Sequence, residues 1–130
     1  MIKKTKWLIK EAGLRVNYMI AKDCLFCKII RGEMKTNFIY KDDMVVAFND
    51  INPVADVHIL VVPKKHIEST AAITDQDGKD LAALFKVATN LANDKKLDAY
   101  RLTFNAGRYQ HVPHLHMHLL AGGKIQWTKL

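Results

Sequence analysis

The 130-residue sequence contains few residues that would brace or interrupt a fold: two cysteines, three prolines and six glycines. It has no apolar run long enough to span a bilayer, which takes about 20 consecutive apolar residues, so a membrane protein is not expected. Internal repeats, low-complexity segments and a linker rich in Pro, Gly or Ser are also missing. With 49% hydrophobic and 25% charged residues, the chain is predicted to form about one domain with its own core.

The formal net charge of +7 is unevenly distributed, because four of the seven excess positive charges fall within residues 1–18. The rest of the sequence has no dense basic stripe interleaved with aromatic residues, and its small basic cluster is Lys64 and Lys65. The stretch 40–62 is net acidic. Sequence-directed binding of nucleic acid is therefore not expected.

The first 18 residues, MIKKTKWLIKEAGLRVNY, are basic and mildly amphipathic. Their apolar stretch is too short, and too often interrupted by Lys and Arg, for a secretory signal. We expect an N-terminal basic appendage, frayed or helical, or an upstream start codon with the functional chain beginning at Met19. Residues 19–130 then form the domain, and a cytoplasmic location is the expected one.

The remaining pattern predicts an α+β domain with an antiparallel sheet, because strands, one helix and further strands follow one another. Strands are expected at 37–41, 44–50, 57–63, 101–105 and 113–120, the first two joined as a hairpin at Asp42 and Asp43. A short helix is expected around 27–31. A main helix capped by Thr74 or Asp75 should bury one face. That face would carry Leu81, Leu84, Phe85, Ala88, Leu91 and Ala92.

Four of the six histidines lie within HVPHLHMHLLAGG, residues 111–123. Residues two apart in a strand share a face, so His114, His116 and His118 should line one side and the apolar residues 115, 117 and 119 the other. A solvated polar face, a metal site and nucleophilic or acid–base catalysis are the three interpretations. The motif has no Asp or Glu to complete a metal site, whereas a neutral imidazole is a good nucleophile near pH 7.

The run His114-Leu-His116-Met-His118-Leu-Leu resembles the His-φ-His-φ-His-φ-φ signature of the histidine-triad (HIT) family of nucleotide hydrolases and transferases. The resemblance extends from about Asp23 to Trp127, through DCLFCKIIRGE, AFNDINP and LVVPKKHI, and the closing AGG…W is similar to the HINT branch. It implies a HIT-like fold: a five-stranded antiparallel sheet with one main helix and a short helix.

The resemblance also implies a homodimer with a continuous ten-stranded sheet, formed through main helices and sheet edges. The C-terminal tail, with Trp127 and Leu130, would reach towards the partner's site. Leu84 and Leu91 could belong to the dimer face or to the core.

The resemblance implies a role for each histidine of the site. His116 would be the nucleophile that attacks the α-phosphorus of a nucleotide, and His118 would contact the phosphate oxygens and share in proton handling. His114 and His58 complete the catalytic group, although His58 taken by itself is as readily a core histidine. The implied nucleotide-binding residues are Phe26, Ile29, Phe48 and Ile51 for the base, Asp50 for the ribose, and Asn105, Gln110 and His111 near the phosphate.

The cysteines Cys24 and Cys27 form a C-x-x-C pair, which in an intracellular protein indicates half a metal site or a redox motif. Some HIT proteins bind zinc through such a pair, the histidine after the Pro-Lys element and the first triad histidine. The corresponding set is Cys24, Cys27, His66 and His114. Zinc would then be structural, and the chemistry would need no cofactor. The alternative is two reduced thiols and two hydrogen-bonded histidines.

The implied function is hydrolysis of purine nucleoside phosphoramidates, AMP joined to an amine or a lysine, through a covalent nucleotidyl-histidine. The alternatives are a dinucleoside polyphosphate hydrolase and a nucleotide- or zinc-binding regulatory module with little turnover. The sequence departs from the family pattern in two places, and the second bears on the preference for a leaving group. The loop between Asn105 and His114 is shorter than is usual in the HINT branch, and His111 stands where the family often has Ser or Thr.

Overall fold

The computed structural model describes residues 23–126 and Leu130, and it divides the chain into two compact units, Met1–Lys35 and Thr36–Leu130. The expectations for residues 1–18, Met19 and Trp127 concern positions outside the described residues. Among the described residues, no helix is both long and apolar enough to cross a membrane.

The described part of the first unit contains one short helix, α2 (Leu25–Ile30). Cys24 is its N-cap, and the Cys24 Sγ accepts a hydrogen bond from the backbone N–H of Cys27 at 3.4 Å. The helix ends at Arg31, and Gly32 follows with φ of 81°, a conformation that favours glycine. The predicted short helix is confirmed, with its start two residues earlier than expected.

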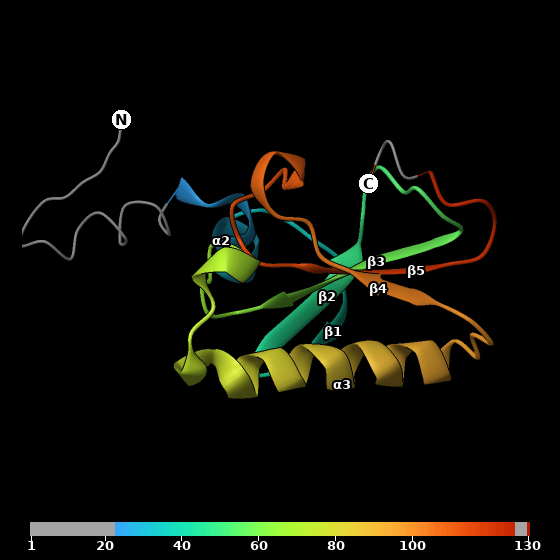
Figure 1. Ribbon diagram of the computed structural model, residues 1–130, viewed down its shortest axis with the longest axis horizontal. Coiled ribbons are helices and arrows are strands. Elements are labelled where there is room, and N and C mark those ends of the chain that lie inside the picture. Colours follow the sequence, from blue (N-terminus) through green and yellow to red (C-terminus); the bar gives the residue numbers. More distant parts are fainter. Residues whose placement is uncertain (1–22, 127–129) are drawn as a thin grey trace, which may run out of the picture. The chain divides into compact units, whose positions relative to one another are not determined.

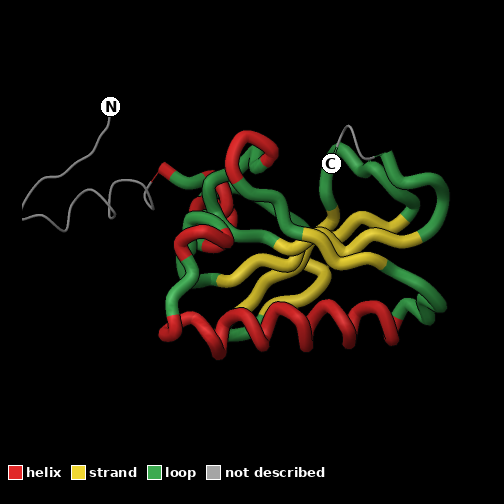
Figure 2. The backbone as a smooth tube through the Cα atoms, in the orientation of Figure 1, coloured by secondary structure: helices red, strands yellow, loops and turns green. Residues whose placement is uncertain are grey.

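The second unit is built on a five-stranded antiparallel sheet, as predicted. Its strands are β1 (Phe38–Lys41), β2 (Val45–Asn49), β3 (Val57–Pro63), β4 (Arg101–Thr103) and β5 (Met117–Ala121), in the order β1-β2-β3-β5-β4 (Figure 1). Three short 3-10 turns, η1 (Thr70–Ala72), η2 (Asp75–Asp77) and η3 (Gly107–Tyr109), lie in its connections. Figure 2 shows the strands as one continuous twisted layer, with β5 joining the edge strand β4 to the rest.

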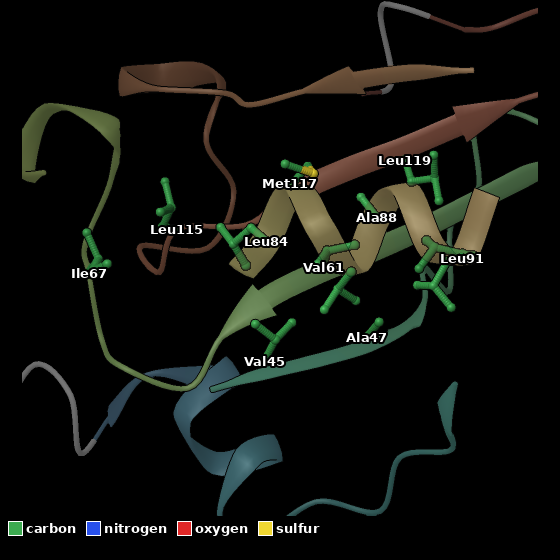
Figure 3. Close-up of a cluster of buried hydrophobic side chains, with 12 residues drawn as sticks. Val45, Ala47, Val61, Ile67, Leu84, Ala88, Leu91, Leu115, Met117 and Leu119 are labelled. Atoms are coloured by element: carbon green, nitrogen blue, oxygen red, sulfur yellow. The ribbon is translucent and has the colours of Figure 1, made fainter. Parts of the chain in front are cut away.

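The main helix, α3 (Gly78–Asp94), runs along one face of this sheet (Figure 2). Thr74 caps the preceding turn η2 in a capping box with Asp77, so the predicted cap lies one short turn before the helix itself. The buried positions of α3 are Leu84, Val87, Ala88, Leu91 and Ala92. All of these except Ala92 pack with alternate residues of the central strands in an apolar core (Figure 3).

Phe85 was predicted in the buried face of this helix, and that prediction is wrong because Phe85 is 47% exposed. One helical residue is 100° of rotation, so a position next to Leu84 lies on the flank of the buried stripe rather than at its centre. Val87 takes the central place instead. The Phe85 ring lies beside the Phe104 ring, with centroids 6.2 Å apart.

The last strand was predicted to begin at residue 113, but β5 begins at Met117. Pro113 has no amide hydrogen to give to a strand. The backbone N–H of His114 donates to Val112 O, and that of Leu115 to Ile67 O. The predicted alternation of side chains nevertheless holds, since Leu115, Met117 and Leu119 all belong to the apolar core.

Candidate active site

His114 is completely buried and is oriented by a main-chain carbonyl. Its Nε2 lies 2.8 Å from Pro63 O, and because a carbonyl can only accept, Nε2 donates. The neutral ring therefore has its lone pair on Nδ1. That nitrogen lies 3.1 Å from Nδ1 of His66, with the two rings edge to face. Two facing nitrogens at this distance can share one proton, or both can bind one cation.

The residue that precedes His66 is held in place by an ion pair. Lys65 Nζ lies 2.5 Å from Asp77 Oδ1, while the other carboxylate oxygen of Asp77 accepts from the backbone N–H and hydroxyl of Thr74. The Lys65 bond holds the pKa of the Asp77 carboxyl below its ordinary value. The loop after β3 is thus joined to the turn that precedes α3, a role that the sequence did not reveal for Lys65 or Asp77.

His116 presents an unprotonated Nε2. Its Nδ1 lies 2.7 Å from His114 O, so Nδ1 donates and the neutral ring has its lone pair on the opposite nitrogen. Burial is the main cause that lowers the pKa of His116, and the charge of His114 acts in the same direction. The ring is therefore neutral near pH 7, which is the state a nucleophilic imidazole requires.

His58 and His118 form a hydrogen-bonded pair with a defined direction. The backbone N–H of Val54 donates to His58 Nδ1 at 3.1 Å, so the proton of the neutral His58 ring is on Nε2. That Nε2–H lies 2.9 Å from His118 Nδ1, which must accept. The proton of His118 is consequently on its Nε2, a buried atom with no hydrogen-bond partner among the described residues.

Burial also keeps this pair neutral. It lowers the pKa of His118 to about 3, with the charges of His116 and His58 acting in the same direction. It lowers the pKa of His58 as well, although the Asp50 carboxylate opposes that shift. The ring centroids of His116 and His118 are 5.0 Å apart. The lone pair of His116 and the N–H of His118 therefore belong to a single site.

Asp50 follows β2 and lies beside this pair, with its Oδ2 3.4 Å from His58 Nε2. Its other oxygen accepts from the backbone N–H of Asn52 at 2.8 Å. Ligand atoms of Asp50, His58 and His118 lie within 4.8 Å of one another, a spacing compatible with a metal ion. A ligating nitrogen must offer a lone pair, whereas the bond from Val54 to His58 Nδ1 leaves the ring proton on Nε2. This tautomer disfavours a metal ion at these three residues.

The remaining predicted nucleotide-binding residues occupy varied positions. Phe48 is buried with its ring 6.3 Å from that of Phe38, whereas Ile51 is 91% exposed. Phe26 and Ile29 are buried residues of α2, in the other unit. Asn105 is half-buried just beyond β4.

The loop between β4 and β5 is attached to the segment after His66 through Gln110. The Gln110 side chain, which the family resemblance implies to be nucleotide-binding, donates through Nε2 to Glu68 O at 2.8 Å. The next residue, His111, is exposed. Its charge is among the causes that lower the pKa values of His116 and His118.

The cysteine pair belongs to the first unit. Both thiols are buried, and the hydrogen bond with Cys24 is the main cause that raises the pKa of the Cys27 thiol. Cys24, Cys27, His66 and His114 each offer one donor atom of the kinds that hold zinc, two from each unit.

Comparison with known proteins supports the interpretation of the histidine cluster. Residues 23–129 match the family described as "Scavenger mRNA decapping enzyme C-term binding". A purine nucleoside phosphoramidase of Escherichia coli is 38% identical over 107 residues, covering 79% of this chain and 90% of that protein. An uncharacterized HIT-like protein of a Synechocystis strain is 40% identical over 111 residues, covering 83% of this chain and 97% of that protein.

Solved structures agree. A HIT family hydrolase from Legionella pneumophila has a TM-score of 0.76 at 40% identity, covering 81% of this chain and 97% of its own. A histidine triad protein from Clostridium difficile has a TM-score of 0.75 at 45% identity, covering 80% and 94%. The chain therefore belongs to the histidine-triad family and is an enzyme of the HIT hydrolase type.

Proposed function

We propose that this enzyme hydrolyses purine nucleoside phosphoramidates, in which AMP is joined to an amine or to a lysine side chain. The observation that carries the proposal is the protonation of His116, whose Nδ1–H bond to His114 O leaves the lone pair on Nε2. A relative with 38% identity is named a purine nucleoside phosphoramidase, which supports this substrate class.

The proposed reaction has two displacements at phosphorus. In the first, His116 Nε2 forms a bond to the α-phosphorus, the P–N bond breaks, and the amine takes up one proton as it leaves. In the second, water adds its oxygen to phosphorus, the bond to His116 breaks, and the proton released by water replaces the one taken by the amine. The products are the amine and AMP, and no metal ion takes part in either step.

The buried Nε2–H of His118 supplies the stabilising hydrogen bond in this scheme. Negative charge develops on the non-bridging phosphate oxygens during both displacements. A donor already held in place within a buried site stabilises such charge without reorganising. Loss of one preorganised donor of this kind costs roughly 10²–10³ in kcat.

The nucleoside is assigned to Asp50 and to apolar residues. A carboxylate accepts strong hydrogen bonds from two sugar hydroxyls, and Asp50 lies beside the catalytic pair. The exposed Ile51 offers an apolar surface for the base. From the family resemblance we also assign Phe48, Phe26 and Ile29 to the base. Asn105 and His111 are assigned to the phosphate and leaving group, and Gln110 to nucleotide binding.

A structural zinc ion held by Cys24, Cys27, His66 and His114 is part of the proposal. The donor set suits tetrahedral zinc. The bond from His114 Nε2 to Pro63 O leaves Nδ1 as the ligating atom and fixes the ring, as outer-shell bonds do at metal sites. When bound, zinc would supply stability, not catalysis. Since thiolate ligands need a reducing compartment, we also propose a cytoplasmic location.

We further propose a homodimer with a continuous ten-stranded sheet. The strand order leaves β4 at one edge of the sheet, where addition of a strand from a second copy would extend the sheet. Near this edge strand, Tyr100 is 39% exposed, and on the main helix Phe85 is 47% exposed. Buried core positions, such as Leu84 and Leu91, are occupied within the chain itself.

The proposed function is tested with an adenosine 5′-phosphoramidate that carries a fluorogenic amine. The wild type should release the amine, and His116→Gly should reduce the rate by at least about 10⁴-fold, since a nucleophile is lost. Asp43→Asn is the control, because it changes an exposed carboxylate outside the proposed site and leaves the nucleophile in place. Faster turnover of a diadenosine polyphosphate would favour the polyphosphate hydrolase, and AMP binding without turnover would favour the regulatory module.

A further inference from the structure

A chain of hydrogen bonds lies between the proposed nucleoside end of the site and its proposed phosphate end, and what we infer from it rests on the proposed function. The first bond of this chain is from the backbone N–H of Val54 to His58 Nδ1, at 3.1 Å. This bond makes His58 a donor through Nε2 alone, because a neutral imidazole has one proton. His58 is 3% exposed, so water does not compete for that proton.

The single proton on His58 Nε2 is bonded to His118 Nδ1, with the two nitrogens 2.9 Å apart. The Asp50 carboxylate lies close to the same N–H, with its Oδ2 3.4 Å from His58 Nε2. A negative charge at this distance attracts the proton electrostatically. The carboxylate therefore competes with the lone pair of His118 and weakens the bond that His58 makes to it.

The bond at His118 Nδ1 matters because it acts through the ring. Hydrogen bonds in a chain polarise one another, so a stronger bond accepted at Nδ1 makes the opposite Nε2–H a better donor. That Nε2–H is buried and has no partner in the described part of the chain. It is the end of the chain Val54–His58–His118 that is left to meet substrate.

We propose that Asp50 is a positioning residue that couples ribose binding to the donor strength of His118. When the sugar hydroxyls donate to the Asp50 carboxylate, they offset part of its negative charge, so it attracts the His58 proton less strongly. The His58 proton is then directed to His118, whose Nε2–H binds the developing charge on phosphate more strongly. Ribose hydroxyls thus increase the rate of the chemical step in addition to increasing affinity.

The experiment compares an adenosine 5′-phosphoramidate with its 2′,3′-dideoxy analogue, both carrying the same fluorogenic amine. Enzyme is in excess, and amine release in a single turnover gives a saturating rate constant and an apparent Kd for each substrate. For the wild type, the dideoxy substrate should show a saturating rate about two- to fivefold lower, besides weaker binding. This estimate is a 10–30% weakening of one hydrogen bond to a charged group.

Variants separate coupling from simple loss of binding. In His58→Ala the connection is cut, so the ratio of the two saturating rates should fall to about one while the difference in Kd remains. Asp50→Asn should also bring the rate ratio to about one, which provides a second test should His58→Ala fold poorly. Asp43→Asn removes an exposed carboxylate of the β1–β2 turn and should keep the wild-type ratio.

Two outcomes overturn the inference alone: equal saturating rates for both substrates in the wild type, or an unchanged rate ratio in both His58→Ala and Asp50→Asn. Release of amine from neither substrate by the wild type overturns the proposed function and this inference together. The failure of one is therefore distinguishable from the failure of the other.

Discussion

The carbonyl oxygen of His114 lies 2.7 Å from Nδ1 of His116, so the main chain of one triad residue sets the protonation of the next. The carbonyl of Pro63 does the same for His114, and the amide of Val54 for His58. Each of these side chains is held in one tautomer by a group that does not titrate. The lone pair and the N–H that the proposed mechanism uses are thus defined before substrate binds.

Lowering the pH should destabilise the fold through His118. Burial lowers its pKa to about 3 from an ordinary 6.5, so between these values the unfolded chain binds a proton that the native chain does not. Stability is fully present above pH 6.5 and falls as the pH decreases. At a pH of about 4.5 the loss from this residue should be about 2–3 kcal/mol.

Urea denaturation above pH 6.5 and at a pH of about 4.5 measures this effect on the free energy of unfolding. His118→Gln should show a smaller decrease in the free energy of unfolding than the wild type, and Lys86→Gln, which alters an exposed side chain of α3, should behave like the wild type. Asp77, whose carboxyl pKa is held below 3.8, loses its contribution only at lower pH. An equal decrease in His118→Gln and the wild type would show that His118 is not responsible.

Gly123→Ala should destabilise the fold more than Gly107→Ala. Both glycines have positive φ, 63° and 65°, so both substitutions introduce the same backbone strain of about 1–2 kcal/mol. At Gly123 an added Cβ would also lie 2.8 Å from the Asp56 carboxylate, whereas at Gly107 it meets nothing within 4 Å. Thermal unfolding of the two variants compares them directly, and equal midpoints would contradict the predicted contact.

Zinc content tests the proposed metal site. Purified protein should hold about one zinc ion per chain by elemental mass spectrometry, and Cys27→Ser and His66→Asn should each reduce this content severely. His111→Asn provides the control, since this histidine is outside the proposed donor set. Chelation should lower the unfolding temperature, because binding to the native state alone stabilises it. Full zinc content in both variants would refute the assignment.

Phe85→Glu should shift the proposed dimer towards monomer. A carboxylate on an exposed face costs little in a monomer, but burying it in an apolar interface is unfavourable. Sedimentation at several protein concentrations would measure the change, with Lys86→Glu on the same helix as an exposed control. A wild type that sediments as a monomer at all concentrations would contradict the dimer.

The sequence predicted most of this fold because the relevant signals are local. Alternation at period two correctly assigned Leu115 and Met117 to the core, and the β-branched run 57–63 became β3 as expected. The start of β5 was misjudged because it depends on where the amide of Leu115 finds its acceptor, Ile67 O, far away in the sequence. The exposure of Phe85 was missed because flank and centre of a helix face look alike in a periodic pattern.

The candidate site was predictable in its residue types but not in its protonation. The motif identified His116 and His118, and the resemblance added His58 and Asp50. The backbone amide of Val54 and the backbone carbonyl of Pro63 determine which nitrogen of the His58 and His114 rings holds the proton. Every residue type has such backbone groups, apart from the missing amide hydrogen of proline, so the sequence does not mark these two positions. The hydrogen bond from the Gln110 side chain to Glu68 O could not be predicted from the sequence either, because every residue has a backbone carbonyl.

The orienting groups around the histidines have a consequence for how this enzyme tolerates mutation. A residue that directs an imidazole with its side chain loses that role in almost any substitution. An amide at position 54 and a carbonyl at position 63 persist through nearly all of them, the exception being proline at 54, which has no N–H. Substitutions at these two positions that preserve the packing therefore leave the tautomers of the oriented histidine rings unchanged.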